Sequence, residues 1–175
     1  MKISTIKVWD PLVRLVHWAI AGIVIFNLLN EGGHFFHRYA GYAALGLLLV
    51  RLIWGLIGTY HARFSTWWPS KVALTAYIQA KRNGSAPKYL SHNPMGAIMM
   101  LFLWGLLLFQ GISGFLLGTD AFFGSGWLEE IHEISGYLFI PAVLIHVLAA
   151  IYESWRTREN LIASMVHGRK SGTQD

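Results

Sequence analysis

The stretch from Ile131 to His146 reads IHEISGYLFIPAVLIH and contains two histidines, His132 and His146, fourteen residues apart in an apolar run. In an α-helix this spacing returns two side chains to within about 40° of one face and separates them by roughly 21 Å along the axis. The two imidazoles therefore cannot bind the same metal ion. Neutral imidazole is a usual axial ligand of haem iron, and an ionisable side chain inside a membrane span is a functional candidate. The stretch predicts two separate cofactor sites at two depths.

The composition predicts a membrane protein. Hydrophobic residues make up 54% of the 175 residues and charged residues 13%, about half the usual share of roughly 25% in soluble domains. Since a membrane helix needs about 20 apolar residues, we expect an all-α fold, an integral membrane four-helix bundle formed by a single domain over residues 1–175. The expected helices are 11–29, 39–58, 95–118 and 134–152, with a connection at 59–94 and a tail at 153–175.

The first apolar run predicts a retained helix rather than a cleaved signal sequence. It lacks a small-residue cleavage site, exceeds the usual apolar core of a signal sequence and contains His17. Asp10 and Pro11 are suited to the N-cap and the first helical position. The chain has no cysteine, which excludes disulfides, iron–sulfur clusters and thioether-linked c-type haem. Any cofactor must therefore be held without a covalent thioether bond.

The distribution of charge predicts the orientation. The connection 59–94 contains five basic residues and no acid, whereas the two connections expected on the other face carry five acids and one basic residue, Arg38. By the positive-inside rule both termini, the connection 59–94 and the tail are cytoplasmic. No combined aromatic and basic pattern makes nucleic acid an expected partner. The five acids are Glu31, Asp120, Glu129, Glu130 and Glu133.

This orientation pairs four histidines by depth. His17 lies near the cytoplasmic start of the first helix, and His146 lies near the cytoplasmic end of the fourth. His37 and His132 lie at the opposite face. Ligands of one iron must lie at a common level, so we expect His17 with His146 at one haem and His37 with His132 at the other.

A short repeat supports the second pair. The segments beginning at His37 and His132 both read His-x-x-x-Gly-Tyr, with glycines at Gly41 and Gly136. A glycine four residues from a ligand lies on the same helix face and leaves room for a flat macrocycle. The alternative is that these glycines only allow close helix packing.

The chain resembles the bacterial cytochrome b561 and nickel-hydrogenase b-type cytochrome superfamily over nearly its whole length. The resemblance is carried by the histidine spacing, by KVWDPLVRLVHW at 7–18, by the motif His92-Asn93-Pro94 and by RENL at 158–161. It implies an inner-membrane, multi-pass cytochrome with two non-covalent b haems, each held by two histidines. It also implies quinone as electron donor or acceptor, and it places the four ligands at His17, His37, His132 and His146.

Three functions are compatible with these features. The first is electron transfer between quinone and a periplasmic partner such as a c-type cytochrome or an oxidoreductase. The second is a superoxide oxidase that reduces membrane quinone, an enzyme activity known within the resembling family. The third is a histidine-lined metal or proton transporter. Whether the protein is an enzyme, and its oligomeric state, are left open by the sequence.

The remaining polar residues in or near the apolar runs allow two interpretations each. Arg51, fourteen residues beyond His37, is suited to bind a haem propionate or to extend to the interface. His34 is an alternative to His37 as a ligand. Pro141 lacks the N–H that the carbonyl of residue 137 would accept in a helix, so it predicts a kink. The third apolar helix has no histidine and is expected to act as a scaffold.

Overall fold

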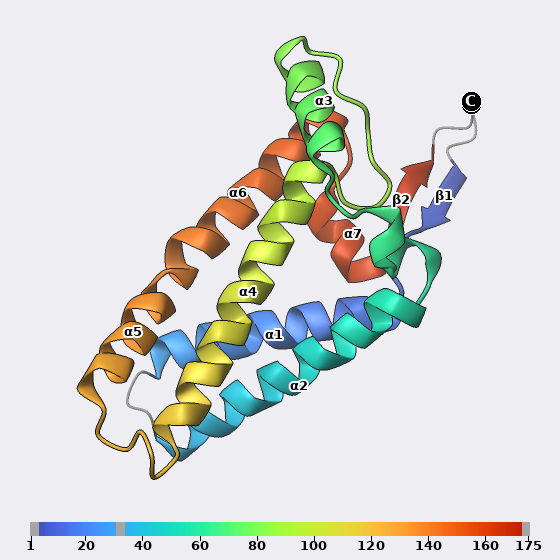
Figure 1. The fold of residues 1–175 in the computed structure, drawn as a ribbon. Helices are drawn as coiled ribbons and strands as arrows, with labels where there is room; N and C mark the ends of the chain where they lie inside the picture. The colour runs from blue at the N-terminus through green and yellow to red at the C-terminus, as the bar shows by residue number, and fades with distance from the viewer. Residues whose placement is uncertain (1–3, 31–33, 173–175) are drawn as a thin grey trace. The chain divides into compact units, whose positions relative to one another are not determined.

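The computed structural model describes residues 4–30 and 34–172 (Figure 1). Glu31, one of the five acids noted above, lies outside these residues. In chain order the elements are β1 (Ser4–Lys7), α1 (Pro11–Leu29), α2 (Phe35–Ile57), η1 (Tyr60–Ala62), η2 (Phe64–Thr66), α3 (Lys71–Arg82), α4 (Pro94–Leu117), α5 (Gly126–Tyr137), α6 (Phe139–Thr157), α7 (Leu161–His167) and β2 (Arg169–Gly172).

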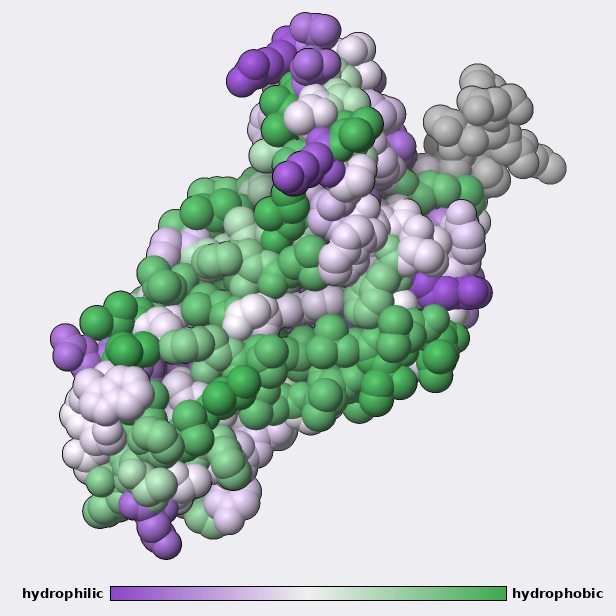
Figure 2. All heavy atoms as spheres, in the orientation of Figure 1, coloured by the Kyte–Doolittle hydropathy of each residue, from purple (hydrophilic) through white to green (hydrophobic). Residues whose placement is uncertain are grey.

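The described residues form a mostly helical protein with four helical segments long and apolar enough to cross a membrane. These segments are α1, α2, α4 and the consecutive helices α5 and α6, which together cover Gly126–Thr157. Large apolar side chains such as Leu15, Leu56 and Leu144 are more than half exposed, as lipid-facing side chains would be. Figure 2 shows hydrophobic residues along the visible face of α2 and hydrophilic residues around α3. The chain is therefore a multi-pass membrane protein, while the orientation of its termini stays a prediction.

The last span differs from the single helix expected at 134–152. It begins earlier, at Gly126, and it consists of two helices that meet at Leu138. Pro141 explains the interruption, because it has no N–H to continue the bonding pattern toward residue 137. His132 lies in α5 and His146 in α6. The second span also begins four residues earlier than expected, at Phe35.

Backbone contacts divide the chain into two compact units, which we describe separately. Unit 1 comprises Met1–Arg14, Ile53–Leu101 and His146–Asp175, and unit 2 comprises Leu15–Leu52 and Phe102–Ile145. The single-domain boundaries of the sequence analysis stay a prediction. The core of unit 2 combines small and large apolar side chains from α2, α4 and α6. Its fully buried members are Ala44, Leu48, Leu106, Leu107 and Phe139.

Unit 1 joins the two ends of the chain. Strands β1 and β2 pair antiparallel, with Ser4 opposite Gly172. Lys170 of β2 is buried, and its ammonium lies 5.1 Å from the centre of the Trp9 ring. Burial lowers the pKa of Lys170 to about 8. The Trp9 ring also contacts the His92 ring at a tilt of 57°, with ring centres 4.9 Å apart. The sequence analysis did not anticipate these strands.

Asp10 begins α1 as the residue types predict. One carboxylate oxygen accepts from the Val13 N–H at 3.0 Å, which is N-cap geometry, and Pro11 is the first helical residue. The other oxygen accepts from Trp54 Nε1 at 2.9 Å and Thr59 Oγ1 at 2.6 Å. Burial alone would raise the pKa of Asp10, but these hydrogen bonds outweigh it and lower the pKa. Asp10 therefore remains charged at neutral pH and ties α1 to the segment after α2.

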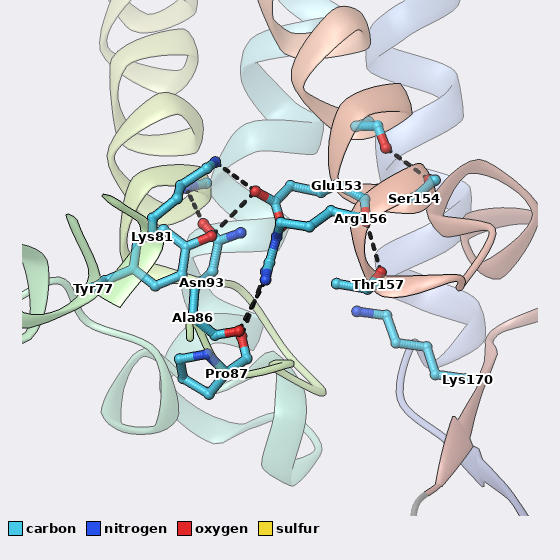
Figure 3. A network of polar contacts seen from close by, with 12 residues as sticks. Tyr77, Lys81, Ala86, Pro87, Asn93, Glu153, Ser154, Arg156, Thr157 and Lys170 are labelled. Atoms are coloured by element: carbon cyan, nitrogen blue, oxygen red, sulfur yellow. Dashed lines mark hydrogen bonds and ion pairs between the residues drawn. The ribbon is translucent and has the colours of Figure 1, made fainter. Parts of the chain in front are cut away.

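Helix α3 packs in unit 1 through a buried carboxylate on α6 (Figure 3). Glu153 accepts hydrogen bonds from Tyr77 Oη at 3.1 Å, Lys81 Nζ at 2.6 Å and Arg156 Nε at 2.9 Å. Burial, together with the negative charge of Glu153, raises the pKa of Tyr77 to about 12. Arg156 also donates to the Ala86 carbonyl at 2.8 Å. The network thus joins α3, the segment after it and α6.

Candidate functional site

Unit 2 contains a cavity of about 470 Å³, within the range of roughly 300–1,000 Å³ typical of ligand and cofactor sites. Its lining is mostly apolar and comes from α1, α2, α4, α5 and the start of α6. His37 of α2 and His132 of α5 both line it. The structure therefore brings together, within one unit, the two histidines that the sequence analysis paired by depth and by the repeated motif.

The two imidazoles are spaced as ligands on opposite sides of one metal. Their ring centres lie 6.2 Å apart, with the planes at 66°. Two metal–nitrogen bonds of about 2 Å each, plus the distance from each ring centre to its nitrogen, give roughly 6 Å. Among the described residues, no group of three or more His, Cys, Asp or Glu side chains is arranged to hold a metal ion. A facing pair of imidazoles suits a metal whose remaining ligands come from a planar cofactor, as in haem.

The protonation of His37 is set by its surroundings. Its Nδ1 lies 2.8 Å from the Asn30 carbonyl oxygen. A carbonyl can only accept, so Nδ1 carries the proton and Nε2 keeps its lone pair. Asn27 donates from Nδ2 to the His37 carbonyl at 3.2 Å. Asn27 lines the cavity, and its buried Oδ1 makes no hydrogen bond to a described residue.

His132 has a side-chain hydrogen-bond partner at the same ring nitrogen. Its Nδ1 lies 2.8 Å from Ser113 Oγ on α4. One helical turn away, Gln110 donates from Nε2 to the His132 carbonyl at 2.7 Å and to Ser135 Oγ at 2.9 Å. Helix α4 therefore contributes polar contacts to the site, beyond the scaffold role expected from its lack of histidine.

The glycines of the repeated motif lie at the cavity wall. Gly41 and Gly136 both line it, and a Cβ on Gly136 would lie 3.2 Å from Gln110 Nε2. A Cβ on Gly41 would meet Asn27 at an ordinary contact distance of 3.7 Å. The space beside Gly114 of α4 is tighter, because a Cβ there would lie 3.0 Å from His132 Cε1. These positions combine close helix packing with space for a flat cofactor.

The other candidate residues lie elsewhere. His17 belongs to unit 2 and His146 to unit 1, so their pairing stays a prediction. Arg51 is only 4% exposed, and its guanidinium carbon lies 5.1 Å from the centre of the Trp104 ring. This position is buried in protein, unlike the interfacial one considered from the sequence. His34 is exposed and lies before the start of α2.

Four acids belong to unit 2, and two of them line this cavity. Glu129 and Glu133 line it, and Asp120 and Glu130 are exposed in the same unit. Within the part of the chain that the structure describes, no ion pair joins these four carboxylates to a basic side chain. These four carboxylates, which we call the acidic edge, belong to the same unit as His37 and His132.

Three polar residues of the site were not identified from the sequence. They are Asn27, Gln110 and Ser113. Each lies in an otherwise apolar span, and Gln110 and Ser113 are three residues apart on one helix face. Polar residues at this spacing inside a membrane helix are a usable signal, because they need partners in a medium without water.

A multi-pass helical membrane protein with two facing histidines in an apolar cavity has the features of a membrane b-type cytochrome. The chain belongs to the prokaryotic cytochrome b561 family, whose model matches residues 8–168. This is a family of di-haem b-type membrane cytochromes that transfer electrons.

Several known sequences are similar to the chain over most of its length. A probable Ni/Fe-hydrogenase B-type cytochrome subunit of Rhizobium leguminosarum bv. viciae is 24% identical, with 95% of this chain and 89% of the relative aligned. The corresponding subunit of Cupriavidus necator is 25% identical, over 97% and 88%. Cytochrome b562 of Cereibacter sphaeroides is 25% identical, over 88% and 92%. No solved structure gives a significant match.

Proposed function

We infer that this protein is a di-haem b-type cytochrome of the bacterial inner membrane that carries electrons between quinone and a periplasmic redox partner. The observation that carries the inference is the facing pair His37 and His132, with ring centres 6.2 Å apart and both Nδ1 atoms hydrogen bonded. In this state each Nε2 is available as a ligand.

The residues of the cavity fit a bound haem. His37 and His132 would hold the iron through their Nε2 atoms from opposite sides, and Gly41 and Gly136 would leave space beside them. Haem bound between two histidines supplies one-electron chemistry. Iron held by both histidines would have no open position for a substrate, which favours electron transfer over oxygen activation.

We assign the second haem to His17 and His146, which the sequence analysis pairs by depth. Arg51 is compatible with this assignment, because it is a buried cation in a membrane span, and ionisable residues there mark functional sites. A guanidinium can bind a haem propionate through a bidentate hydrogen bond. Trp104 below the guanidinium adds a cation–π contact.

Two observations support the choice of a periplasmic redox partner. The relatives include probable hydrogenase cytochrome subunits, and the acidic edge of unit 2 suits a basic redox protein. If the charge-based orientation is correct, this edge faces the periplasm. We propose a c-type cytochrome or an oxidoreductase as the partner there, and quinone as the second redox partner.

The purified chain is expected to contain two haems per polypeptide, both extractable without breaking a covalent bond. The reason is that four histidines form two pairs and no cysteine can form a thioether bond. Iron analysis together with the pyridine haemochrome spectrum, both normalised to protein by amino-acid analysis, measures the ratio. A ratio of one in protein reconstituted with excess haem would contradict the pairing.

Neutralising the acidic edge is expected to slow electron transfer to a basic partner. In a triple variant, Asp120→Asn, Glu129→Gln and Glu130→Gln, we expect reoxidation of the reduced haems by a basic c-type cytochrome to slow by roughly tenfold at low salt. The difference should disappear at high ionic strength, because salt screens long-range steering. Stopped-flow absorbance at several salt concentrations measures both effects.

A matched charge change elsewhere separates docking from a general effect of net charge. Ala76→Lys, Gln79→Lys and Asn83→Lys together raise the net charge by the same three units at exposed residues of unit 1 and should not reproduce the loss. If the triple variant keeps the rate and salt dependence of the wild type, the docking proposal is wrong, whereas the di-haem assignment is unaffected.

A further inference from the structure

We propose that Ser113 is a positioning residue that sets the electron-donating strength of His132, and thereby the reduction potential of the haem bound by His37 and His132. The proposal rests on the haem assignment above. It adds a specific role for α4, the helix without a histidine.

The hydrogen bonds around Ser113 suit an accepting role toward His132. Ser113 Oγ lies 2.9 Å from the Phe109 carbonyl oxygen and 3.2 Å from that of Gln110, so its single proton has a backbone acceptor. When His132 binds iron through Nε2, the neutral imidazole carries its proton on Nδ1, which then donates to Ser113 Oγ at 2.8 Å. The serine side chain thus pairs with Nδ1 and leaves Nε2 for the metal.

The position of Ser113 relative to the imidazole is rigidly set. Ser113 is 3% exposed, so bulk water does not compete for Nδ1. The neighbouring Gly114 lets the His132 ring approach the α4 backbone, since a Cβ there would lie 3.0 Å from His132 Cε1. Gln110 fastens the His132 carbonyl to the same helix at 2.7 Å. The contacts of Gln110, Ser113 and Gly114, on one face of α4, therefore fix the position of His132.

The two sides of the proposed haem differ chemically. His37 donates to a backbone carbonyl, that of Asn30, which no side-chain substitution can remove. His132 donates to a hydroxyl whose own proton is engaged by a helix carbonyl, and such chained hydrogen bonds strengthen one another. Only on the His132 side does a side chain control the acceptor.

An acceptor at Nδ1 makes an imidazole a more basic ligand. A more basic axial ligand stabilises oxidised iron relative to reduced iron, so removal of the acceptor should raise the reduction potential. Loss of a partner of this kind typically changes metal affinity or activity by about 10- to 100-fold. We expect the lower end of this range here, because the Nε2 bond itself remains.

The test is Ser113→Ala in the full-length haem-loaded protein, followed by redox titration monitored in the visible α-band. We expect one haem to become easier to reduce by roughly tenfold in its equilibrium constant, which is about 59 mV for one electron. The other haem should not shift. Ser113→Thr retains a hydroxyl and should restore the wild-type potential.

Ser135→Ala is the matched control. Ser135 is also a buried serine beside His132, but its hydroxyl donates to backbone carbonyls, accepts from Gln110 and makes no hydrogen bond with an imidazole. Gln110 keeps its hydrogen bond to the His132 carbonyl without Ser135, so the loss of Ser135 should leave both potentials unchanged. The proposal is overturned if Ser113→Ala retains two haems with unchanged potentials, or if Ser113→Thr behaves like Ser113→Ala. Loss of one haem in Ser113→Ala that Ser113→Thr restores would support it. Failure of the haem assignment itself is recognised separately, by His132→Ala retaining two haems.

Discussion

His132→Ala and His37→Ala are each expected to reduce the haem content from two per chain to one. Each substitution removes one of two imidazoles whose ring centres lie 6.2 Å apart across a cavity of about 470 Å³. The remaining histidine cannot hold the iron from both sides, and the apolar lining offers no replacement ligand of equal strength. Haem stoichiometry by pyridine haemochrome, with protein determined independently, gives the result.

Histidines at other positions provide the controls for this experiment. His34→Ala should keep two haems, because His34 is exposed and lies three residues before His37. His17→Ala and His146→Ala should also lose one haem, but they should lose the one that His37 and His132 do not bind. Low-temperature absorption spectra of the four ligand variants should therefore fall into two classes. If His17→Ala resembles His132→Ala, the depth pairing is wrong; if His34→Ala loses a haem and His37→Ala does not, the ligand on α2 is misassigned.

Glu153→Ala is expected to be strongly destabilising, by about 3–5 kcal/mol. The carboxylate is buried and is shared by Tyr77, Lys81 and Arg156. Its removal leaves the hydroxyl of Tyr77, a residue that is 2% exposed, without this acceptor and leaves two cations without their counter-charge. For a chain of this size the loss corresponds to a fall of the unfolding midpoint by roughly 6–20 °C.

Far-ultraviolet circular dichroism in detergent measures this midpoint independently of haem. Limited trypsinolysis supplies a local readout, because detachment of α3 should expose the bonds after Lys81 and Arg82. Glu153→Gln, which keeps one acceptor oxygen, should lower the unfolding midpoint less. Glu130→Ala makes the same truncation at an exposed position and should change the free energy of unfolding by no more than about 0.5 kcal/mol. An unchanged midpoint and an unchanged digestion pattern in Glu153→Ala would show that the network does not hold α3.

Several features could be predicted from the sequence because they are properties of local residue types. The four apolar segments are helical, since hydropathy and length alone require internally bonded backbone in a membrane. Asp10 and Pro11 begin α1, because capping depends on neighbouring residues.

Topology alone predicts the pairing of His37 with His132. A common depth limits which histidines can share a metal, and the repeated His-x-x-x-Gly-Tyr motif marks the same two positions. The structure places these two rings together. Their role as ligands stays a prediction until haem is measured, as does the pairing of His17 with His146.

The sequence by itself therefore determined the class of protein, the number of spans and the set of candidate ligands. These follow from hydropathy, side-chain chemistry and spacing along one helix. Only the tertiary structure decided which acceptor each imidazole takes, the Asn30 carbonyl for His37 and Ser113 for His132. It also decided that Glu153 meets Tyr77 and Lys81, which are 76 and 72 residues away. Such contacts join distant segments, and no periodicity within either segment encodes where the other will lie.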